Sequence, residues 1–303
     1  MQSVKKWQLA TACACIFWGI SGLFGKALFN ASSQADALWL CQVRMIISAL
    51  ILLLIAAIMR KDVFSIFRTK HDFILAVSYG LLGMLPVQYC YFQVIELANA
   101  SIATILQFIG PFLILLYLGA TKQQIIRPVD VMAIVLAFLS VFLLATHGKF
   151  NQLAITQIVL FWGFMSALGV CGNALLPPKL LKNNSAIVTS GWGMLFSGIA
   201  LVIVRPHMPA VSYTEPVITN LALVIVIGTI IPFTIITLVL RHIKPSTVGL
   251  LDAFEPVSAT LGSVLFFGLM MSPSDWIGTI LVIASTMIIN IQFKSKKIKR
   301  KKL

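Results

Sequence analysis

The chain has 303 residues, of which 59% are hydrophobic and 11% charged, and its mean hydropathy is +0.98. A composition this apolar excludes a soluble globular protein and indicates an integral membrane protein. The formal net charge is +14. Nucleic-acid binding is nevertheless not expected, because nearly all of the Lys and Arg residues fall outside the apolar runs and on one side of the predicted membrane protein.

Successive apolar runs of the chain are each long enough for a helix to cross a hydrocarbon core of about 30 Å. They lie near residues 7–29, 38–59, 73–95, 101–120, 129–146, 154–176, 186–204, 217–240, 246–270 and 275–293. The sequence therefore predicts an all-α integral membrane protein with ten transmembrane helices.

The basic residues are distributed unevenly between the two sides of this predicted bundle. With the N-terminus in the cytoplasm, nineteen of the 23 Lys and Arg residues lie on the cytoplasmic side, three lie on the other side, and Arg44 lies within a span. This positive-inside pattern predicts a multi-pass protein of the cell (plasma or inner) membrane with both termini in the cytoplasm. Contact with anionic lipid headgroups is an additional expectation for the basic tail.

The second half of the chain repeats features of the first. Phe17-Trp18-Gly19 recurs at 161–163, and GLFGKAL at 22–28 recurs as GVCGNAL at 169–175. Five helices in each half is an odd number, so the two halves insert with opposite orientations. The sequence predicts two inverted five-helix repeats, residues 1–148 and 152–293, followed by a basic cytoplasmic tail at 294–303.

Prolines interrupt corresponding helices of the two halves. Pro86 matches Pro232, and Pro111 matches Pro256, at nearly the same offset as the other repeated motifs. Each proline leaves a backbone carbonyl without its usual helical donor, which lipid does not tolerate but a polar cavity does. The four prolines are predicted hinges around a central cavity; the alternative is that they only kink membrane helices.

With these motifs, the chain resembles the EamA-like members of the drug/metabolite transporter superfamily. The resemblance is carried by the FWG start of each half, VRMIISALILLL, ASIATILQFIGPFLILLYLG, STVGLLDAFEPVSATLGSVLFFG and SPSDWIGTILVIAS. It implies an inner-membrane carrier of ten helices, commonly an exporter of amino acids or other small metabolites. The family often has an acid where this chain has Ala120 and Leu269, so the substrate of a particular relative does not transfer to this chain.

Two acids stand inside the ninth predicted span. Asp252 and Glu255 are three residues apart and share one helix face. An ionised acid facing lipid costs roughly 2.5–3.5 kcal/mol on insertion scales, so both acids must face protein or water. They are predicted to bind a proton or a substrate amine. The alternatives are structural pairs, Asp252 with Arg241 or Lys244 and Glu255 with Arg44.

Other polar and aromatic side chains within the spans are candidates for the same site. Arg44 could bind a substrate carboxylate or form a structural pair, and Lys26 could be a ligand or extend to the membrane surface. Amides and aromatic rings could form the pocket walls or simply join helices. These candidates are Gln107, which aligns with Asp252, and Gln88, Tyr89, Trp18, Trp162 and Trp192.

Four further side chains are expected to lie outside any site. Glu96 is expected to be a solvated loop charge, and Trp7, Trp39 and Trp276 are expected to anchor span ends at the membrane surface. No metal set, catalytic residue or cofactor motif is predicted, and the oligomeric state is not indicated.

The leading hypothesis is a secondary active transporter that exports a small polar metabolite, such as an amino acid or related amine, by alternating access with possible proton coupling. Two alternatives remain open. One is a flippase for a lipid or a lipid-linked group, and the other is a non-transporting membrane enzyme or partner protein.

Overall fold

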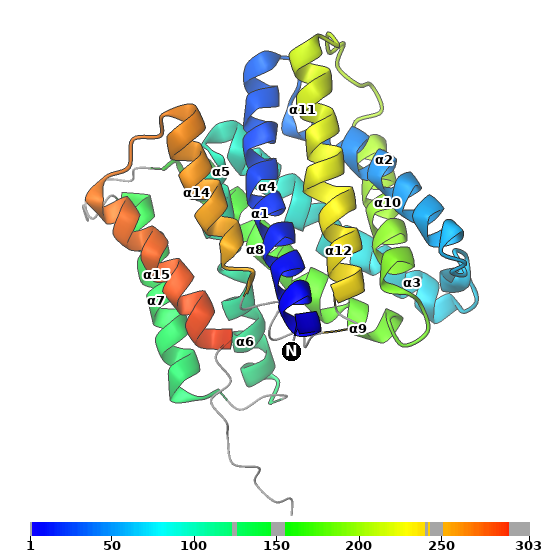
Figure 1. Ribbon diagram of the computed structural model, residues 1–303, viewed down its shortest axis with the longest axis horizontal. Helices are drawn as coiled ribbons and strands as arrows, with labels where there is room; N and C mark the ends of the chain where they lie inside the picture. Colours follow the sequence, from blue (N-terminus) through cyan, green and yellow to red (C-terminus); the bar gives the residue numbers. More distant parts are fainter. Residues whose placement is uncertain (1, 123–125, 147–154, 240–241, 243–250, 291–303) are drawn as a thin grey trace, which may run out of the picture.

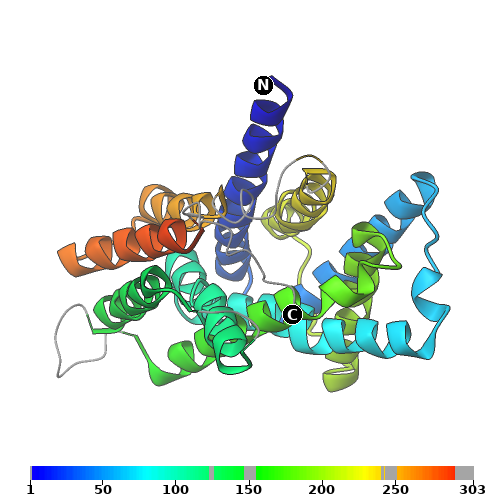
Figure 2. The ribbon, with the colours of Figure 1, turned by 90° about the horizontal axis from the view of Figure 1, so that it is seen from below.

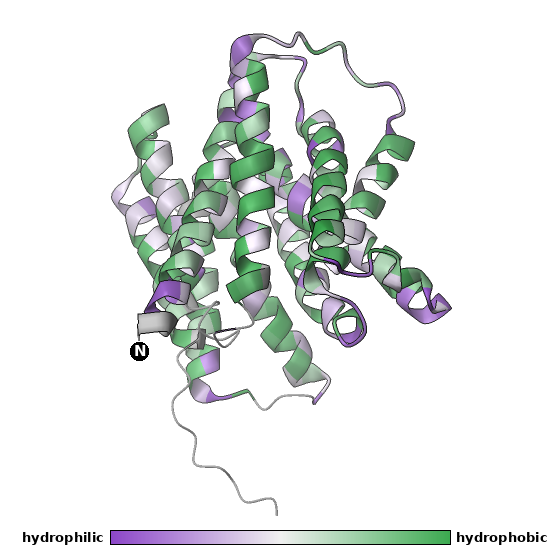
Figure 3. Cartoon of the chain, turned by 45° about the vertical axis from the view of Figure 1, so that its right-hand side comes forward, coloured by the Kyte–Doolittle hydropathy of each residue, from purple (hydrophilic) through white to green (hydrophobic). Residues whose placement is uncertain are grey.

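The structure is a computed structural model that describes residues 2–122, 126–146, 155–239, 242 and 251–290. Every regular element within these residues is helical (Figure 1). Apolar residues cover most of the helix surfaces, and polar residues gather at the helix ends (Figure 3). Seven of the helices are long and apolar enough to cross a membrane, and the stretches Pro128–Leu143 and Phe254–Phe267 are shorter apolar helices.

The first part of the chain contains three continuous helices and two interrupted ones. In chain order the elements are α1 (Gln2–Ala31), α2 (Ala37–Ile58), η1 (Ser65–Phe67), α3 (Lys70–Tyr79), η2 (Gly80–Met84), α4 (Leu85–Leu97), α5 (Ala100–Gln107), α6 (Gly110–Ala120) and α7 (Pro128–Thr146). The elements α3, η2 and α4 form one span, and so do α5 and α6.

The second part has a similar series of elements. These are α8 (Gln157–Leu175), α9 (Pro177–Leu180), α10 (Ala186–Val204), α11 (Glu215–Ile225), η3 (Val226–Ile230), α12 (Ile231–Val239), α14 (Phe254–Phe267) and α15 (Pro273–Asn290). The predicted link at 149–152 and the basic tail at 294–303 lie outside the described residues, as do parts of the predicted spans 154–176, 217–240, 246–270 and 275–293.

Short polar side chains fix where several spans begin. Asp36 accepts a hydrogen bond from the Trp39 amide at the start of α2 (2.7 Å), and Asn99 accepts one from the Ile102 amide at the start of α5 (2.9 Å). These side chains satisfy N–H groups that have no partner within the helix. At the other end of a span, Gly268 adopts a φ of +61° and terminates α14.

Each of the first two matched prolines follows a widened helical turn. The π-helical turn η2 precedes Pro86, and the π-helical turn η3 precedes Pro232, at the same distance along the chain. The Ser197 hydroxyl donates to the Gly80 carbonyl in η2 (2.8 Å). The guanidinium of Arg44 donates to the Gly228 carbonyl in η3 (3.4 Å). Side chains from α10 and α2 therefore supply donors at the two interruptions.

The other two prolines also lie at helix interruptions. A turn at Phe108 and Ile109 separates α5 from α6 just before Pro111, and Asp252 and Ala253 form a turn just before α14, which contains Pro256. The Glu255 amide donates to the Asp252 carbonyl, at 2.9 Å. This hydrogen bond satisfies the Asp252 carbonyl, which in a regular helix would accept from residue 256, because Pro256 has no N–H group to donate.

Helix α1 runs through the middle of the bundle and packs against α14 on one side and α11 and α12 on the other. Two peripheral groups flank it, α2 with α3 and α10, and α7 with α15 (Figure 2). The crossing of α1 and α14 is close, since a Cβ added at Gly19 would lie 2.4 Å from the Glu255 carbonyl oxygen. Glycine is required there because a larger side chain would push the two helices apart.

The largest buried apolar cluster lies toward the face where α1 ends. It joins α1, α2, α4, α5, α10 and α11 around residues such as Leu28, Met45 and Ile95. Trp39 belongs to this cluster with 1% of its surface exposed, so the expectation that it anchors a span at the membrane surface is wrong. The first turn of α2 is buried, and the Trp39 ring packs near the Tyr213 ring, with ring centres 6.3 Å apart.

Candidate functional site

A central cavity of about 220 Å³ lies where the interrupted helices meet α1 and α2. Its walls hold six of the side chains that the sequence proposed for a site, together with the predicted hinge Pro111. These six are Trp18, Arg44, Gln88, Gln107, Asp252 and Glu255. Residues about 240 positions apart in the chain therefore meet at one cavity.

The two acids lie at the start of α14. Asp252 is in the turn before the helix, and Glu255, with 9% of its surface exposed, is in the first turn. The N-terminus of a helix carries a partial positive charge, which favours a negative charge there. The thiol of Cys15 on α1 lies next to the Asp252 carboxylate. The interruption before α14 therefore brings two carboxyl groups to the cavity wall, where a proton or a cation can neutralise them.

Arg44 reaches the cavity from α2 and is held by the second π-helical turn. Its Nε donates to the Thr229 hydroxyl at 2.8 Å, and its Nη2 donates to the Gly228 carbonyl at 3.4 Å. The guanidinium carbon lies 4.9 Å from the centre of the Phe92 ring. Gly228 is four residues before Pro232, so Arg44 contacts the carbonyl that the proline leaves without a helical donor.

The expected structural pair between Arg44 and Glu255 is not present. Within the described residues, Arg44 forms no ion pair, although its side chain is only 5% exposed. Its Nη1 has no protein partner in the same part of the chain and remains for a ligand or water in the cavity. The other proposed partners of the acids, Arg241 and Lys244, lie outside the described residues.

Amide side chains form the wall contributed by α4, α5 and α8. Gln107 donates to the Val87 carbonyl at 2.8 Å and to the Ser166 hydroxyl at 2.7 Å, so it joins three helices. Gln88 makes only a long contact, 3.7 Å, from its Nε2 to the Met84 sulfur. The buried side-chain oxygens of Gln88 and Asn173 accept no hydrogen bond within the described residues. This wall therefore has two acceptors whose hydrogen bonds are not satisfied.

Several lining residues were missed by the sequence interpretation. Asn173 aligns with Lys26 in the repeated motif, so the repeat itself could have indicated it. Tyr91 and Phe92 lie three and four residues after Gln88, and helical spacing places all three on one face. No comparable signal identifies Phe233, which packs edge-on against Trp18 with ring centres 5.6 Å apart.

Three aromatic candidates lie outside the cavity lining. Tyr89 and Trp162 contact each other edge-on at 5.6 Å between ring centres. Trp192 donates from its indole nitrogen to the Val63 carbonyl at 2.8 Å, and so lies against the loop after α2. Tyr89 neighbours Gln88 in the chain, but one helical step of about 100° turns it away from the cavity.

Lys26 is separated from the two acids. It lines a second cavity, of about 240 Å³, with Asn30 and Asn99. Its Nζ donates to the Ile95 and Glu96 carbonyls, each at 3.2 Å, and so satisfies carbonyls at the end of α4. In this position Lys26 joins α1 to α4 and does not approach the central cavity.

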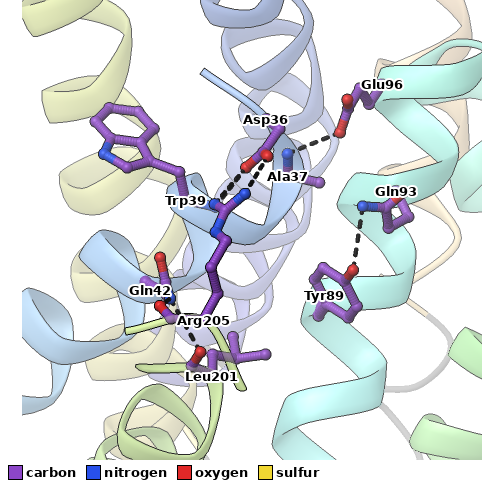
Figure 4. A network of polar contacts seen from close by, with 9 residues as sticks. All are labelled: Asp36, Ala37, Trp39, Gln42, Tyr89, Gln93, Glu96, Leu201 and Arg205. Carbon is purple, nitrogen blue, oxygen red and sulfur yellow. Dashed lines mark hydrogen bonds and ion pairs between the residues drawn. The ribbon is translucent and has the colours of Figure 1, made fainter. Parts of the chain in front are cut away.

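A polar network links α2, α4 and α10 on the face where α1 ends (Figure 4). The Arg205 Nη2 donates to the Asp36 carboxylate at 2.8 Å, and Gln42 donates to the Leu201 and Arg205 carbonyls at 2.9 Å each. Glu96 accepts from the Ala37 amide at 2.7 Å, so the expectation that it is a solvated loop charge is wrong. Its carboxylate instead satisfies a free amide at the start of α2.

The charges of this network stabilise each other. Burial alone would raise the pKa of Asp36, but the hydrogen bonds from Arg205 and the Trp39 amide outweigh it, so the pKa lies below its ordinary value. The hydrogen bond to Asp36 also raises the pKa of Arg205. The pair therefore remains ionised at neutral pH and links the start of α2 to the end of α10.

A bundle of membrane-length helices surrounds a small cavity, with two acids beside a helix interruption and an arginine from α2 in its wall. This arrangement is typical of membrane transporters. The EamA-like transporter family model matches residues 5–146 and 157–291, nearly the whole chain. The chain therefore belongs to the EamA-like transporter family and is a membrane transporter, not an enzyme.

Two comparisons with other proteins agree with this assignment. The chain is 27% identical over 297 residues to a protein of Salmonella typhimurium (strain LT2) described as uncharacterized inner membrane transporter YicL, covering 98% of this chain and 99% of that one. A solved crystal structure has the same fold, with a TM-score of 0.64 at 15% identity, covering 94% of this chain and 96% of that one. Together with the apolar helices, the relative supports a multi-pass protein of the plasma (inner) membrane.

Proposed function

We propose that the protein is a secondary active exporter of a small polar metabolite, such as an amino acid or a related amine, and works by alternating access. The observation that carries this proposal is the pair of carboxyl groups, Asp252 and Glu255, on the wall of the central cavity. Neither acid forms an ion pair with another described residue, so a substrate ammonium group or a proton is the available counter-charge.

The cavity limits the size of the solute. Its volume of about 220 Å³ lies below the roughly 300–1,000 Å³ of sites for drug-sized ligands. Aromatic rings of Trp18 and Phe233 offer apolar and cation–π contacts, and the free Nη1 of Arg44 offers a donor to a carboxylate. These groups suit a small amine and an amino acid alike.

Proton coupling follows from the same two acids. Two carboxyl groups that share one cavity titrate as a coupled pair, so binding a cationic substrate and binding a proton compete for the same negative charge. A carrier with this competition takes up a proton on one side as it releases the substrate there. We propose exchange of substrate for proton, with Glu255 as the principal proton acceptor and Asp252 as its partner.

Alternating access requires two parts that move relative to each other. We propose that residues 1–148 and 152–293 are inverted repeats and that Pro86, Pro111, Pro232 and Pro256 act as hinges. The equal spacing of η2 and η3 from their prolines, and the separate family matches at 5–146 and 157–291, support this division. Interrupted helices bend more easily because fewer backbone hydrogen bonds hold the turn.

The structure bears on which side of the cavity is closed. The largest apolar cluster and the Asp36–Arg205 pair both lie toward the face where α1 ends. If both termini are cytoplasmic, as the basic residues suggest, the extracytoplasmic side is closed. We propose that the structure represents the cytoplasm-facing conformation, in which substrate enters the cavity from the cytoplasm before export.

The test is transport by the purified protein in liposomes across an imposed pH gradient, using a library of labelled amino acids and amines. Glu255→Gln and Asp252→Asn are expected to reduce transport at least tenfold and to weaken its pH dependence, because each removes a charge that binds proton or amine. Glu215→Gln, which changes an acid at the start of α11 outside the cavity, is the matched control. Unchanged rate and pH dependence in both site variants would refute the mechanism.

A further inference from the structure

The connection between α2 and α3 carries an exposed basic and aromatic surface. We define it as the interfacial loop, residues 59–69 with Lys70 and Phe73. Phe64, Phe67 and Phe73 expose 67%, 45% and 38% of their surfaces. Because the loop joins two spans, Ala37–Ile58 and Lys70–Leu97, it lies where the hydrocarbon core meets the headgroups.

The aromatic rings of this loop form one connected layer over α10. Phe67 packs edge-on against Trp192 with ring centres 4.7 Å apart, and Phe64 lies 6.2 Å from the same indole. Phe67 also contacts Phe73 at 5.6 Å. The indole nitrogen of Trp192 is held by the Val63 carbonyl, and Ile66 is fully buried beneath the loop. The layer is therefore a fixed apolar surface and not a set of free side chains.

The same loop carries several positive charges. The side chains of Arg60, Lys61 and Lys70 form no ion pair within the described residues, whereas Arg68 is paired with Asp62. Aromatic rings at the level of the headgroups with unpaired cations beside them match the two parts of an anionic phospholipid.

The backbone holds Arg60 in a defined position at the start of this loop. The Arg60 amide donates to the Ala57 carbonyl and the Lys61 amide to the Ala56 carbonyl, each at 2.9 Å, which is the helix-ending motif that normally has glycine at the position of Arg60. Arg60 has a φ of +54°, in the left-handed region that disfavours a side chain. The helix-ending motif therefore fixes the backbone of Arg60 where α2 meets the interfacial loop.

We propose that the interfacial loop binds an anionic phospholipid, with Arg60, Lys61 and Lys70 at the phosphate and the rings of Phe64 and Phe67 against the glycerol and upper acyl chains. The bound lipid fixes the loop against α10 through Trp192. This proposal is independent of the transported solute, because none of these residues lines the central cavity.

The test measures lipid binding to the full-length protein in detergent by native mass spectrometry, with phosphatidylglycerol and phosphatidylcholine as probes. The wild-type protein is expected to prefer phosphatidylglycerol. Arg60→Gln combined with Lys61→Gln is expected to reduce this preference by about fivefold for each charge removed. Lys5→Gln combined with Lys6→Gln removes the same amount of charge at the exposed start of α1. This control variant is expected to retain the preference for phosphatidylglycerol.

Two further variants and a soluble competitor distinguish a bound lipid from a bound phosphate group alone. Phe64→Ser is expected to weaken phosphatidylglycerol binding although every charge remains, and soluble glycerol phosphate is expected not to compete. Arg60→Gly removes one charge while relieving the left-handed strain, so it tests the charge in a variant that is expected to fold. An unchanged lipid preference in the loop variants, an equal loss in the Lys5/Lys6 control, or full competition by glycerol phosphate would overturn the proposal.

Discussion

At the scale of residues, the same kind of side chain has different roles in this protein according to its partners. Arg44 and Arg205 both lie near helix ends or interruptions, but Arg205 is paired with Asp36, whereas Arg44 contacts only uncharged groups. Lys26 is likewise satisfied by the carbonyls that end α4. Of these three cations, Arg44 is the one that lines the central cavity, and it has no carboxylate partner among the described residues.

The Asp36–Arg205 pair gives a prediction for the dependence of stability on pH. The pKa of Asp36 is lower in the folded protein than in the unfolded chain. Its stabilising effect is therefore complete above the unfolded pKa of about 3.9 and is lost as the pH falls through the lower folded value. Asp36→Asn is expected to reduce the melting temperature at pH 7 and to flatten its decline below about pH 4.

The measurement is thermal unfolding in detergent between pH 3 and pH 7. Both side chains are about one third exposed, so solvent screening keeps the expected contribution below about 1 kcal/mol. Asp62→Asn, in the more exposed pair with Arg68, is the control and is expected to have a smaller effect. A larger change in the control than in Asp36→Asn would contradict the assignment.

At the scale of elements, interruptions and close crossings position the site more than regular helix does. The start of α14 presents Asp252 and Glu255 to the cavity, and α1 approaches the same turn closely at Gly19. Similarly, η3 presents a free carbonyl and Thr229 to Arg44. These arrangements depend on residues that carry no functional group of their own, namely glycine and proline.

Gly19→Ala is expected to destabilise the protein by about 1–3 kcal/mol, because the new methyl group would meet the Glu255 backbone oxygen at 2.4 Å. Backbone cannot move aside as a flexible side chain can. The control is Gly119→Ala in α6, where the nearest atoms belong to the Ile126 side chain. Chemical denaturation in mixed micelles compares the two variants, and equal stabilities would show that α1 and α14 are not in close contact.

At the scale of the whole molecule, a buried contact joins the two parts of the chain. Ser101 on α5 and Thr260 on α14 form a buried hydrogen bond of 2.8 Å, although they are 159 residues apart. If the parts separate here during transport, this bond must break.

Thr260→Val keeps the shape of the side chain but removes its hydroxyl group. The variant is expected to favour opening by about 1 kcal/mol, roughly fivefold in population. Hydrogen–deuterium exchange should increase in α5 and α14 and remain unchanged in the peripheral pair α7 and α15. A uniform increase across all helices would indicate general destabilisation instead of opening at this contact.

The sequence by itself determined the membrane class, the helical nature of the spans, the family and most of the charged candidates for the site. These follow from composition, from the length of apolar runs and from repeated motifs, all of which are local or compare one stretch with another. Six of the ten proposed site residues line the cavity: the acids, Arg44, the two amides and Trp18.

Only the tertiary structure decided which polar groups neutralise each other. It placed Lys26 and Glu96 at helix ends, paired Arg205 with Asp36, and left the two acids and Arg44 without charged partners among the described residues. The sequence shows that a span contains a charged residue, but the free-energy cost of burying that charge depends on the atoms that surround it. Those atoms come from helices far apart in the chain, so the pairing, and with it the site, is fixed only when the helices pack.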